Sequence, residues 1–253
     1  MTSAAPDGLC LRCVGTGDAF AHGGRLNSCY HISYADRQIL FDCGCSSLIG
    51  LRRMQLNPAE IDVIVVSHLH GDHFGGIPFL LLEAKYVSQR RRPLLLIGPP
   101  ALQERVEATL DLLYPGTCAE SFAFSIDYQQ LDEQQSIDLP AGGKLHCVRV
   151  KHGKSADVFG LRLEAVDRIL AYTGDSEWTE SLIPLARNAD LLIAECFTYA
   201  EKLASHLNYL TLEERRQQLT CRQLALTHMG PEMLKNIDRV KFLTLQDEDL
   251  IVL

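Results

Sequence analysis

Three histidines and one aspartate lie within residues 68–73, where the sequence reads His-Leu-His-Gly-Asp-His. The preceding residues 61–66 are mainly apolar and predict a buried strand, and Gly71 allows a sharp turn after it. Imidazole nitrogen and carboxylate oxygen are the ligands that divalent cations such as zinc prefer. A single histidine is more often a core residue, but four ligand-type side chains at one strand end need another explanation. The segment therefore predicts a metal site formed by His68, His70, Asp72 and His73.

Three strands predicted later in the chain also end near a ligand-type residue. Each is an apolar run, followed within a few positions by a histidine or aspartate and a nearby glycine. Taken alone, each of these polar residues would be interpreted as an ordinary loop or capping residue. Because the same arrangement is repeated, we expect them to collect at one edge of a sheet-based scaffold. These further candidates are His152, Asp175 and His228.

The order of these residues resembles the pattern of the metallo-β-lactamase superfamily. That pattern is His-x-His-x-Asp-His followed by a distant histidine, aspartate and histidine, and the resemblance covers almost the whole chain. Residues 15–19, 25–28 and 41–44 are also similar to the first strands of that superfamily. Within it, the chain is most similar to the ribonuclease Z and phosphodiesterase branch, through residues 194–198 and 205–209.

The resemblance implies two metal ions that share one bridging aspartate, which is Asp175 here. A carboxylate can bridge two cations through its two oxygens and a neutral imidazole cannot, and Asp175 is the only acid among the distant candidates. We expect the two divalent ions to be Zn²⁺, with Mn²⁺ as the alternative. The implied ligands are His68, His70, His152 and Asp175 for the first metal, and Asp72, His73, Asp175 and His228 for the second.

Such a centre predicts hydrolysis by a metal-bridging hydroxide. Two ions about 3.5–4 Å apart can lower the pKa of a shared water toward ~7, and no serine or cysteine nucleophile stands in a recognisable motif. Asp72 is counted among the catalytic residues as well as the ligands. We interpret His206 as a general acid for the leaving group and Glu195 as the residue that orients it. The resemblance implies the same proton-relay pair, and the alternative is a capping histidine with a salt-bridged glutamate.

The favoured substrate is a small phosphodiester or nucleotide. Ribonuclease Z enzymes typically carry a long tRNA-binding arm between the third histidine and the bridging aspartate, whereas residues 153–174 are filled here by two predicted strands and a turn. The formal charge of −8 also opposes binding of long nucleic acids, which requires clustered Lys and Arg. Two alternatives stay open: an ester or lactone hydrolase, and a ribonuclease Z-like tRNA 3′ endonuclease without the arm. A non-catalytic relative of the same fold would usually have lost ligands, and none is missing.

Length and composition fit one α/β domain over residues 1–253, with 47% hydrophobic residues available for a core. The resemblance implies an αββα four-layer sandwich, with two mixed β-sheets flanked by helices. The polar segment 127–144 is expected to be a surface excursion, and the basic run 90–92 a solvated helix end. Strands are expected near 9–14, 29–34, 38–42, 61–67, 94–97, 145–150, 158–164, 168–173, 191–195 and 222–227. Helices are expected near 46–54, 75–89, 100–113, 179–187 and 211–219.

The remaining sequence features concern location and partners. No apolar run is long enough to cross a bilayer, and the N-terminal residues do not resemble a secretory signal. Nine scattered cysteines fit a reducing compartment better than a disulfide framework, so the expected location is the cytoplasm. The expected partner is a small-molecule substrate, and no association with a membrane is expected. The assembly that we consider is a homodimer.

Overall fold

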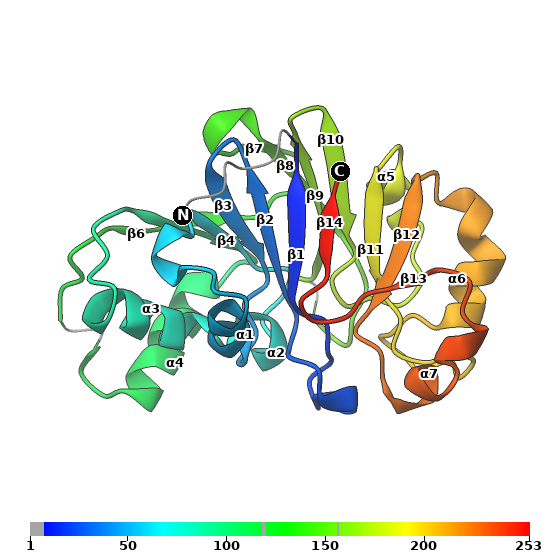
Figure 1. Cartoon of the computed structure of the whole chain (residues 1–253), viewed down its shortest axis with the longest axis horizontal. Helices are drawn as coiled ribbons and strands as arrows, with labels where there is room; N and C mark the ends of the chain where they lie inside the picture. The colour runs from blue at the N-terminus through cyan, green and yellow to red at the C-terminus, as the bar shows by residue number, and fades with distance from the viewer. Residues whose placement is uncertain (1–7, 118–119, 156) are drawn as a thin grey trace.

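The computed structural model describes residues 8–117, 120–155 and 157–253, and two seven-stranded β-sheets form its centre (Figure 1). In spatial order, the strands of the first sheet are β14 (Leu250–Val252), β1 (Cys10–Gly15), β2 (Cys29–Tyr34), β3 (Arg37–Phe41), β4 (Val63–Val65), β5 (Leu94–Gly98) and β6 (Ile126–Gln130). Those of the second are β13 (Leu243–Thr244), β12 (Gln223–Thr227), β11 (Leu191–Glu195), β10 (Arg168–Tyr172), β9 (Phe159–Ala165), β8 (Lys144–Arg149) and β7 (Ile137–Asp138).

Both sheets are mixed. The strands from β3 to β6 run parallel, as do those from β10 to β13, while the other neighbouring strands pair antiparallel. The α-helices are α1 (Ser47–Arg53), α2 (Gly71–Phe74), α3 (Ile77–Tyr86), α4 (Leu102–Leu113), α5 (Leu182–Ala186), α6 (Tyr209–Arg215) and α7 (Pro231–Lys235). Short 3₁₀ helices are η1 (His22–Gly24), η2 (Pro58–Glu60), η4 (Pro140–Gly142), η5 (Arg216–Gln218) and η6 (Ile237–Arg239).

Three apolar clusters hold four layers together, as the α/β sandwich prediction requires. One cluster lies between the inner faces of the sheets and contains Tyr30, Phe41 and Tyr172. A second joins the outer face of the first sheet to α1, α3 and α4, and a third joins the second sheet to α5, α6 and α7 (Figure 1). Each helix buries its apolar side against a sheet, which confirms the expected αββα class.

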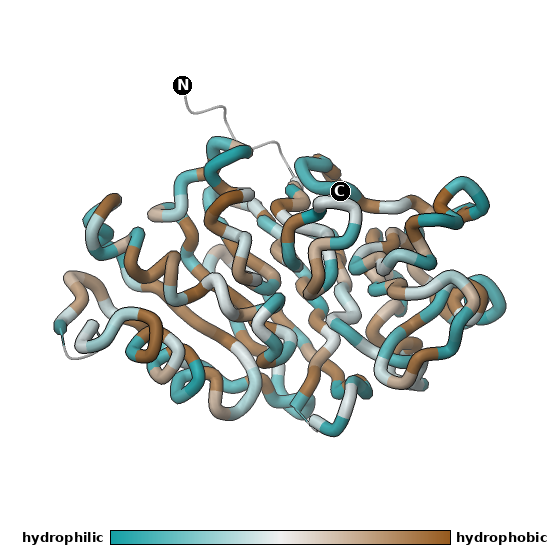
Figure 2. Tube along the Cα trace, turned by 90° about the horizontal axis from the view of Figure 1, so that it is seen from below, coloured by the Kyte–Doolittle hydropathy of each residue, from teal (hydrophilic) through white to brown (hydrophobic). Residues whose placement is uncertain are grey.

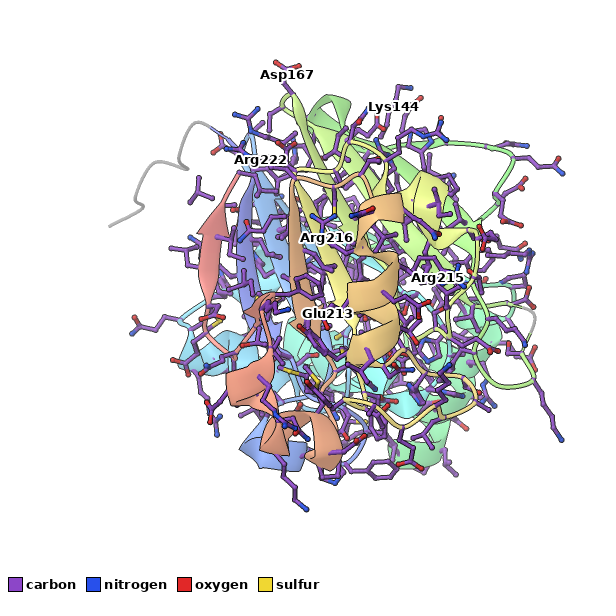
Figure 3. All side chains as sticks on the ribbon, turned by 90° about the vertical axis from the view of Figure 1, so that its right-hand side faces the viewer. Lys144, Asp167, Glu213, Arg215, Arg216 and Arg222 are labelled. Carbon is purple, nitrogen blue, oxygen red and sulfur yellow. The ribbon has the colours of Figure 1, made fainter. Side chains whose placement is uncertain are left out.

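The helix α6 shows how polar residues line the outside of these layers. Its Tyr209 and Leu212 are buried in the third cluster, while Glu213 and Arg215 lie on the outer side (Figure 3). The Arg215 guanidinium lies over the Trp178 ring, 5.1 Å from its centre, where the cation is attracted to the aromatic face. In Figure 2, apolar segments run through the interior strands and polar ones gather in the peripheral loops.

All ten expected strands and all five expected helices have counterparts, but the segment 127–144 differs from its prediction. It contributes an edge strand to each sheet, since β6 pairs with β5 and β7 pairs with β8. These strands are short: β6 alternates apolar and polar residues only over residues 126–129, and β7 has two residues, so the apolar signal of each is brief. The helices α2 and α7 and the strands β13 and β14, each of five residues or fewer, were also not expected.

The basic run 90–92 differs from its prediction at Arg90, whereas Arg91 and Arg92 are exposed as expected. Arg90 is buried, and its guanidinium donates hydrogen bonds to the backbone carbonyls of Ala59, Ile61, Arg92 and Pro93. A guanidinium has five N–H donors in a fixed plane, which suits a group of loop carbonyls that lack strand partners. Arg90 therefore fastens the loop before β4 to the loop before β5, and does not form a solvated helix end.

No helix in the described part of the chain is both long and apolar enough to span a bilayer.

Candidate metal centre

The parallel strands of both sheets direct their carboxyl ends to the same edge of the sandwich, which lies at the bottom of Figure 1 near α2 and α7. The loop after β4 carries His68 and His70, and α2 carries the next two candidates. The loop after β10 carries Asp175, and His228 directly follows β12. Antiparallel β8 also ends here and leads to His152. The edge therefore gathers polar side chains from both sheets, and the apolar strands behind them form the core.

All seven predicted ligand residues meet at this edge in two groups. Nitrogens of His68, His70 and His152 lie within 4.8 Å of one another, and His152 Nε2 faces His70 Nδ1 at 3.1 Å. Two nitrogens that share a tetrahedral zinc ion are about 3.3 Å apart, so this spacing fits a common ion. The second group has the same 4.8 Å limit and contains Asp72, His73, Asp175 and His228.

Asp175 lies between the two groups. Its Oδ2 is 3.8 Å from His152 Nε2 and 3.3 Å from His228 Nε2, while its Oδ1 is 3.3 Å from His73 Nε2. Burial by itself would raise the pKa of this carboxyl, but the His228 and His73 rings lower it well below its ordinary value. The carboxylate is therefore ionised and reaches both groups, as a bridging ligand must.

The chemistry of these buried atoms fits a bound metal. Among the described residues, His68 Nε2, His73 Nε2 and Asp175 Oδ1 are buried and make no hydrogen bond. Buried polar atoms almost always have a hydrogen-bond partner, and three ligand atoms without one that lie in the same place fit the coordination of a cation. Burial, aided by the neighbouring His73, lowers the pKa of His68 well below its ordinary value, which keeps its ring neutral as a metal ligand requires.

A second layer of hydrogen bonds orients His73. Its Nδ1 lies 2.7 Å from Oδ2 of the buried Asp42, which also accepts hydrogen bonds from the Ser67 hydroxyl and the Tyr172 hydroxyl. Asp42 Oδ1 accepts the Ser67 backbone N–H at 2.7 Å. A carboxylate on the far ring nitrogen fixes the tautomer that leaves Nε2 as the ligand atom. Sequence reasoning did not assign this role to Asp42, although Asp42 is the last residue of the predicted strand 38–42 and directly precedes Cys43-Gly44.

His228 is held by the loop between β1 and β2. Its backbone N–H donates to the Thr16 carbonyl at 3.0 Å, and its Nδ1 lies 3.4 Å from the Ser28 hydroxyl. The residue adopts a left-handed backbone conformation with φ 54°, which is rare for a side chain of this size. These contacts stabilise that conformation and direct Nε2 toward Asp175. Neither Thr16 nor Ser28 was singled out from the sequence.

Glu195 and His206 form a contact beside the first group of ligands. His206 Nδ1 lies 3.0 Å from Oε1 of the fully buried Glu195, which also accepts the Ser176 N–H. Burial raises the pKa of Glu195 to about 7, against the lowering effect of its hydrogen bond from His206. Burial would lower the pKa of His206, but Glu195 raises it above its ordinary value. The pair therefore retains a proton near neutral pH.

The His206 ring is fixed by its neighbours. It stacks on Phe197 with the ring centres 4.8 Å apart, and it meets the His152 ring edge-on at 4.9 Å. With Nδ1 on Glu195, the remaining nitrogen, Nε2, is available to a molecule at the metal edge. His70 is exposed, and Asp72 and His206 are partly exposed, so the cluster is open to solvent on this side.

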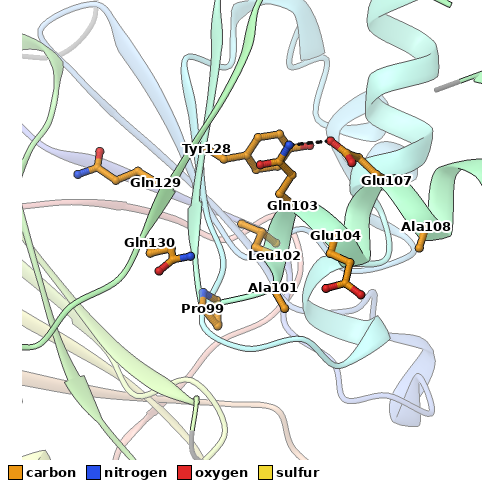
Figure 4. A pocket seen from close by; sticks show the side chains of 10 residues that line it. All are labelled: Pro99, Ala101, Leu102, Gln103, Glu104, Glu107, Ala108, Tyr128, Gln129 and Gln130. Carbon is orange, nitrogen blue, oxygen red and sulfur yellow. Dashed lines mark hydrogen bonds between the residues drawn. The ribbon is translucent and has the colours of Figure 1, made fainter. Parts of the chain in front are cut away.

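A hollow of about 520 Å³ lies elsewhere, between α4 and β6 (Figure 4). Its lining includes Gln103 and Glu107, joined by a hydrogen bond of 2.9 Å, and Gln129. Its only ligand-type side chains are Glu104 and Glu107, without a histidine, cysteine or aspartate, so this lining offers no set of ligands comparable to the metal edge. The metal edge is therefore the candidate site of catalysis.

The comparisons with known proteins agree with this geometry. A ribonuclease Z of Agathobacter rectalis is 26% identical over 282 residues, which cover 91% of this chain and 90% of the relative. The metallo-β-lactamase fold protein YhfI of Bacillus subtilis has a similar structure, with a TM-score of 0.76, 21% identity and coverage of 96% of this chain and 99% of that one. Human tRNase Z, short form, has a TM-score of 0.77 and 23% identity, and 96% and 98% of the two chains are covered.

The fold and its relatives place the protein among the metal-dependent hydrolases of the metallo-β-lactamase superfamily, in the ribonuclease Z and phosphodiesterase branch. Residues 9–250, almost the whole chain, match one family within it. The chain belongs to the family described as Anti-Pycsar protein Apyc1.

Proposed function

We propose that the protein is a phosphodiesterase that uses two divalent metal ions, Zn²⁺ in preference to Mn²⁺, to hydrolyse a small phosphodiester or nucleotide. The observation that carries the proposal is the division of seven ligand residues into two groups with Asp175 between them. Seven ligands are too many for one tetrahedral ion. When bound, such a pair of ions supplies activated water at neutral pH and stabilises negative charge on the phosphate.

In this proposal the protein's own residues divide the remaining work. His68, His70 and His152 would hold one ion, and Asp72, His73 and His228 the other, with Asp175 shared. Asp42 would keep Nε2 of His73 directed at its ion. His206 would donate a proton from Nε2 to the departing oxygen, because its Nδ1 is engaged by Glu195 and its raised pKa favours the protonated ring.

Two observations support a small substrate over a long nucleic acid. The described residues between His152 and Asp175 form β9, β10 and their connecting turn, so this region holds no extended arm. The formal charge of −8 would repel a polyanion that contacts many phosphates. A single phosphodiester needs only the local positive charge of the two ions.

The first test combines metal analysis with a substrate screen. Protein stripped with a chelator and reconstituted should bind two ions per chain and hydrolyse phosphodiesters faster than lactones, thioesters or a tRNA precursor. One bound ion with full activity would contradict the dinuclear centre. Faster hydrolysis of lactones would show that the protein is an esterase and not a phosphodiesterase. Asp175→Ala should lose at least one ion and most of kcat, because it removes the ligand shared by both groups.

We also propose that the described residues form one catalytic domain, and that two copies of the protein associate as a homodimer. Ligands come from both sheets, so neither half contains a complete site. The dimer surface that we propose is the face of α1, α3 and α4, where Ile49, Tyr86, Val87 and Tyr114 are exposed around a hollow of about 1050 Å³. Arg53 and Glu83 also line it, and in a two-fold dimer the same patch of each chain would meet its own copy.

Light scattering tests this assembly directly. The protein should have the mass of two chains, and Val87→Glu should give the mass of one chain by placing a charge in the apolar face. Leu250→Glu changes another exposed apolar residue, on β14, and should leave the dimer intact. A single-chain mass for the unchanged protein would refute the assembly and would leave the metal centre unaffected.

A further inference from the structure

The loops that follow β11 and β12 meet at the metal edge, because these two strands are parallel neighbours and end together. The loop after β11 contains Phe197 and continues to His206. The loop after β12 contains His228 and Gly230 and leads directly into α7, which lies below β12 in Figure 1. A candidate metal ligand and the candidate general acid are therefore on adjoining loops, and contacts between these loops relate their positions.

Gly230 is a point where the two loops touch. Its backbone N–H donates to the Phe197 carbonyl at 2.9 Å. A Cβ on Gly230 would lie 2.8 Å from that carbonyl oxygen, and 2.9 and 3.0 Å from Cε2 and Cζ of the Phe197 ring. The backbone of Gly230 is extended, with φ −77° and ψ 179°, a conformation that any residue adopts. Glycine is therefore needed here for space and not for backbone geometry, and Phe197 occupies that space.

The face of the Phe197 ring lies against His206. The two ring centres are 4.8 Å apart and the planes meet at 27°, so the rings are stacked. The torsion that turns an imidazole plane has a broad energy minimum, so the hydrogen bond from Nδ1 to Glu195 leaves the plane free to tilt. A flat ring packed against His206 restricts this tilt and so sets the direction of Nε2.

The first turn of α7 also holds the backbone that carries Phe197. The Glu232 carboxylate accepts the backbone N–H groups of residues 199–201 at 3.1, 3.3 and 3.4 Å. Hydrogen bonds to an ionised acceptor are stronger than those between neutral groups, so three of them fix this part of the loop. Phe197 is thus held through its carbonyl by Gly230, and the residues after it are held by Glu232.

We infer that Phe197 is a positioning residue for His206 and that Gly230 provides the space that its ring needs. Glu195 holds Nδ1 of His206, and the Phe197 stack fixes the plane of the ring, so that Nε2 faces the departing oxygen of the substrate. Phe197 acts only through His206. The inference rests on the proposed function, in which His206 is the general acid.

A matched pair of variants separates this role from a general effect on the loop. Phe197→Leu keeps an apolar side chain but removes the flat face, and Tyr199→Leu makes a comparable change where the ring stacks on Tyr209, with the centres 5.1 Å apart. Proton NMR of the metal-free proteins should show a downfield signal from His206 Nδ1–H that is absent from His206→Ala. Phe197→Leu should broaden or abolish this signal, because the ring can then tilt away from Glu195, and Tyr199→Leu should retain it.

The zinc-reconstituted proteins are then compared on two substrates. Phe197→Leu should lower kcat for diethyl phosphate by roughly tenfold, because a misdirected acid protonates the alkoxide poorly. Its kcat for bis(4-nitrophenyl) phosphate should fall much less, and two ions should remain bound. Gly230→Ala should cause the same selective loss, since the added Cβ displaces the Phe197 ring. Tyr199→Leu should match the unchanged protein on both substrates.

Four results would overturn the inference: no downfield signal in the unchanged protein, an intact signal in Phe197→Leu, equal losses of kcat on both substrates, or the loss of an ion from Phe197→Leu. Equal losses would mean that Phe197 only supports the loop, and loss of an ion would mean that it supports the ligands. If the unchanged protein with two ions hydrolyses neither diester, the proposed function fails. The NMR comparison alone then decides whether Phe197 holds the His206 ring.

Discussion

Among single residues, Asp42 shows how a side chain outside the ligand set can control one inside it. It interacts with Ser67, Tyr172 and His73 through four contacts, so its carboxylate has little freedom to move. Because it is buried, it cannot exchange these partners for water without cost. The orientation of His73 therefore depends on a residue that touches no metal.

We predict that Asp42→Asn lowers the metal affinity by roughly 10–100-fold, because an amide cannot stabilise the His73 ring as a carboxylate does. Competition with a coloured chelator measures the change. Asp167→Asn is a matched control: Asp167 has φ 58° and Asp42 has φ 57°, but Asp167 lies in the exposed turn after β9. Equal affinities for the two variants would show that Asp42 does not orient the ligand.

His206 would supply the proton that the leaving group takes up. His206→Ala should slow an alkyl phosphodiester by something like 10²–10⁴-fold, because an alkoxide leaves poorly without a proton. Bis(4-nitrophenyl) phosphate has a leaving group that departs unaided, so its rate should fall much less. The metal content should not change. Equal losses on both substrates would mean that His206 positions the substrate, and loss of metal would make it a ligand.

At the scale of elements, the turns after the strands determine whether the ligands meet. Gly153 and Gly174 each stand next to a ligand, and both are left-handed, with φ 60° and 59°. They differ in their surroundings. A Cβ on Gly174 would lie 2.9 Å from the Phe159 carbonyl oxygen and 3.1 Å from Ser67 Cβ, whereas nothing lies within 4 Å of one on Gly153. The turn after β10 is therefore packed directly against the strand ends that carry the other ligands.

This difference gives a matched pair of variants. Gly153→Ala should cost about 1 kcal/mol of unfolding free energy, from backbone strain alone. Gly174→Ala should cost roughly 2–4 kcal/mol and also weaken metal binding, because the collision with backbone displaces Asp175. Urea unfolding and metal titration measure both effects. Equal costs for the two variants would show that the packing around Gly174 can relax.

At the scale of the whole molecule, a buried histidine away from the metal edge links stability to pH. His31 lies in β2 with an exposed fraction of 2%, and burial, assisted by Arg12, lowers its pKa from 6.5 to about 4. Well above pH 6.5 the ring is neutral in both the folded and the unfolded chain, so its titration does not change the free energy of unfolding. As the pH falls from 6.5 toward 4, only the unfolded chain takes up the proton, and stability is lost.

We therefore predict that metal-free protein loses about 2 kcal/mol of unfolding free energy between pH 7 and 5 through this residue. His31→Gln cannot take up the proton and should show a correspondingly smaller loss over the same range. Urea unfolding of both proteins at the two pH values gives the comparison. The same loss in the variant would assign the pH dependence to other groups.

The sequence by itself determined the elements with strong local signals. Apolar runs such as 168–173 and 191–195 are strands because their side chains fill the space between and behind the sheets, and local composition reports this burial. The ligand candidates were also predictable, because His and Asp residues repeatedly follow such runs. Their metal roles stay predictions here, and the structure adds that all seven lie at one edge of the sandwich, in two groups.

Only the tertiary structure decided which weak segments join the sheets and which polar residues support the site. The short edge strand β14 pairs with β1, which is distant in sequence, and two of its three side chains are exposed, so no local pattern identifies it. Asp42 and Arg90 also look like ordinary surface residues in the sequence. Their roles depend on donors and carbonyls brought to them from other loops, and such long-range contacts form only when the chain is folded.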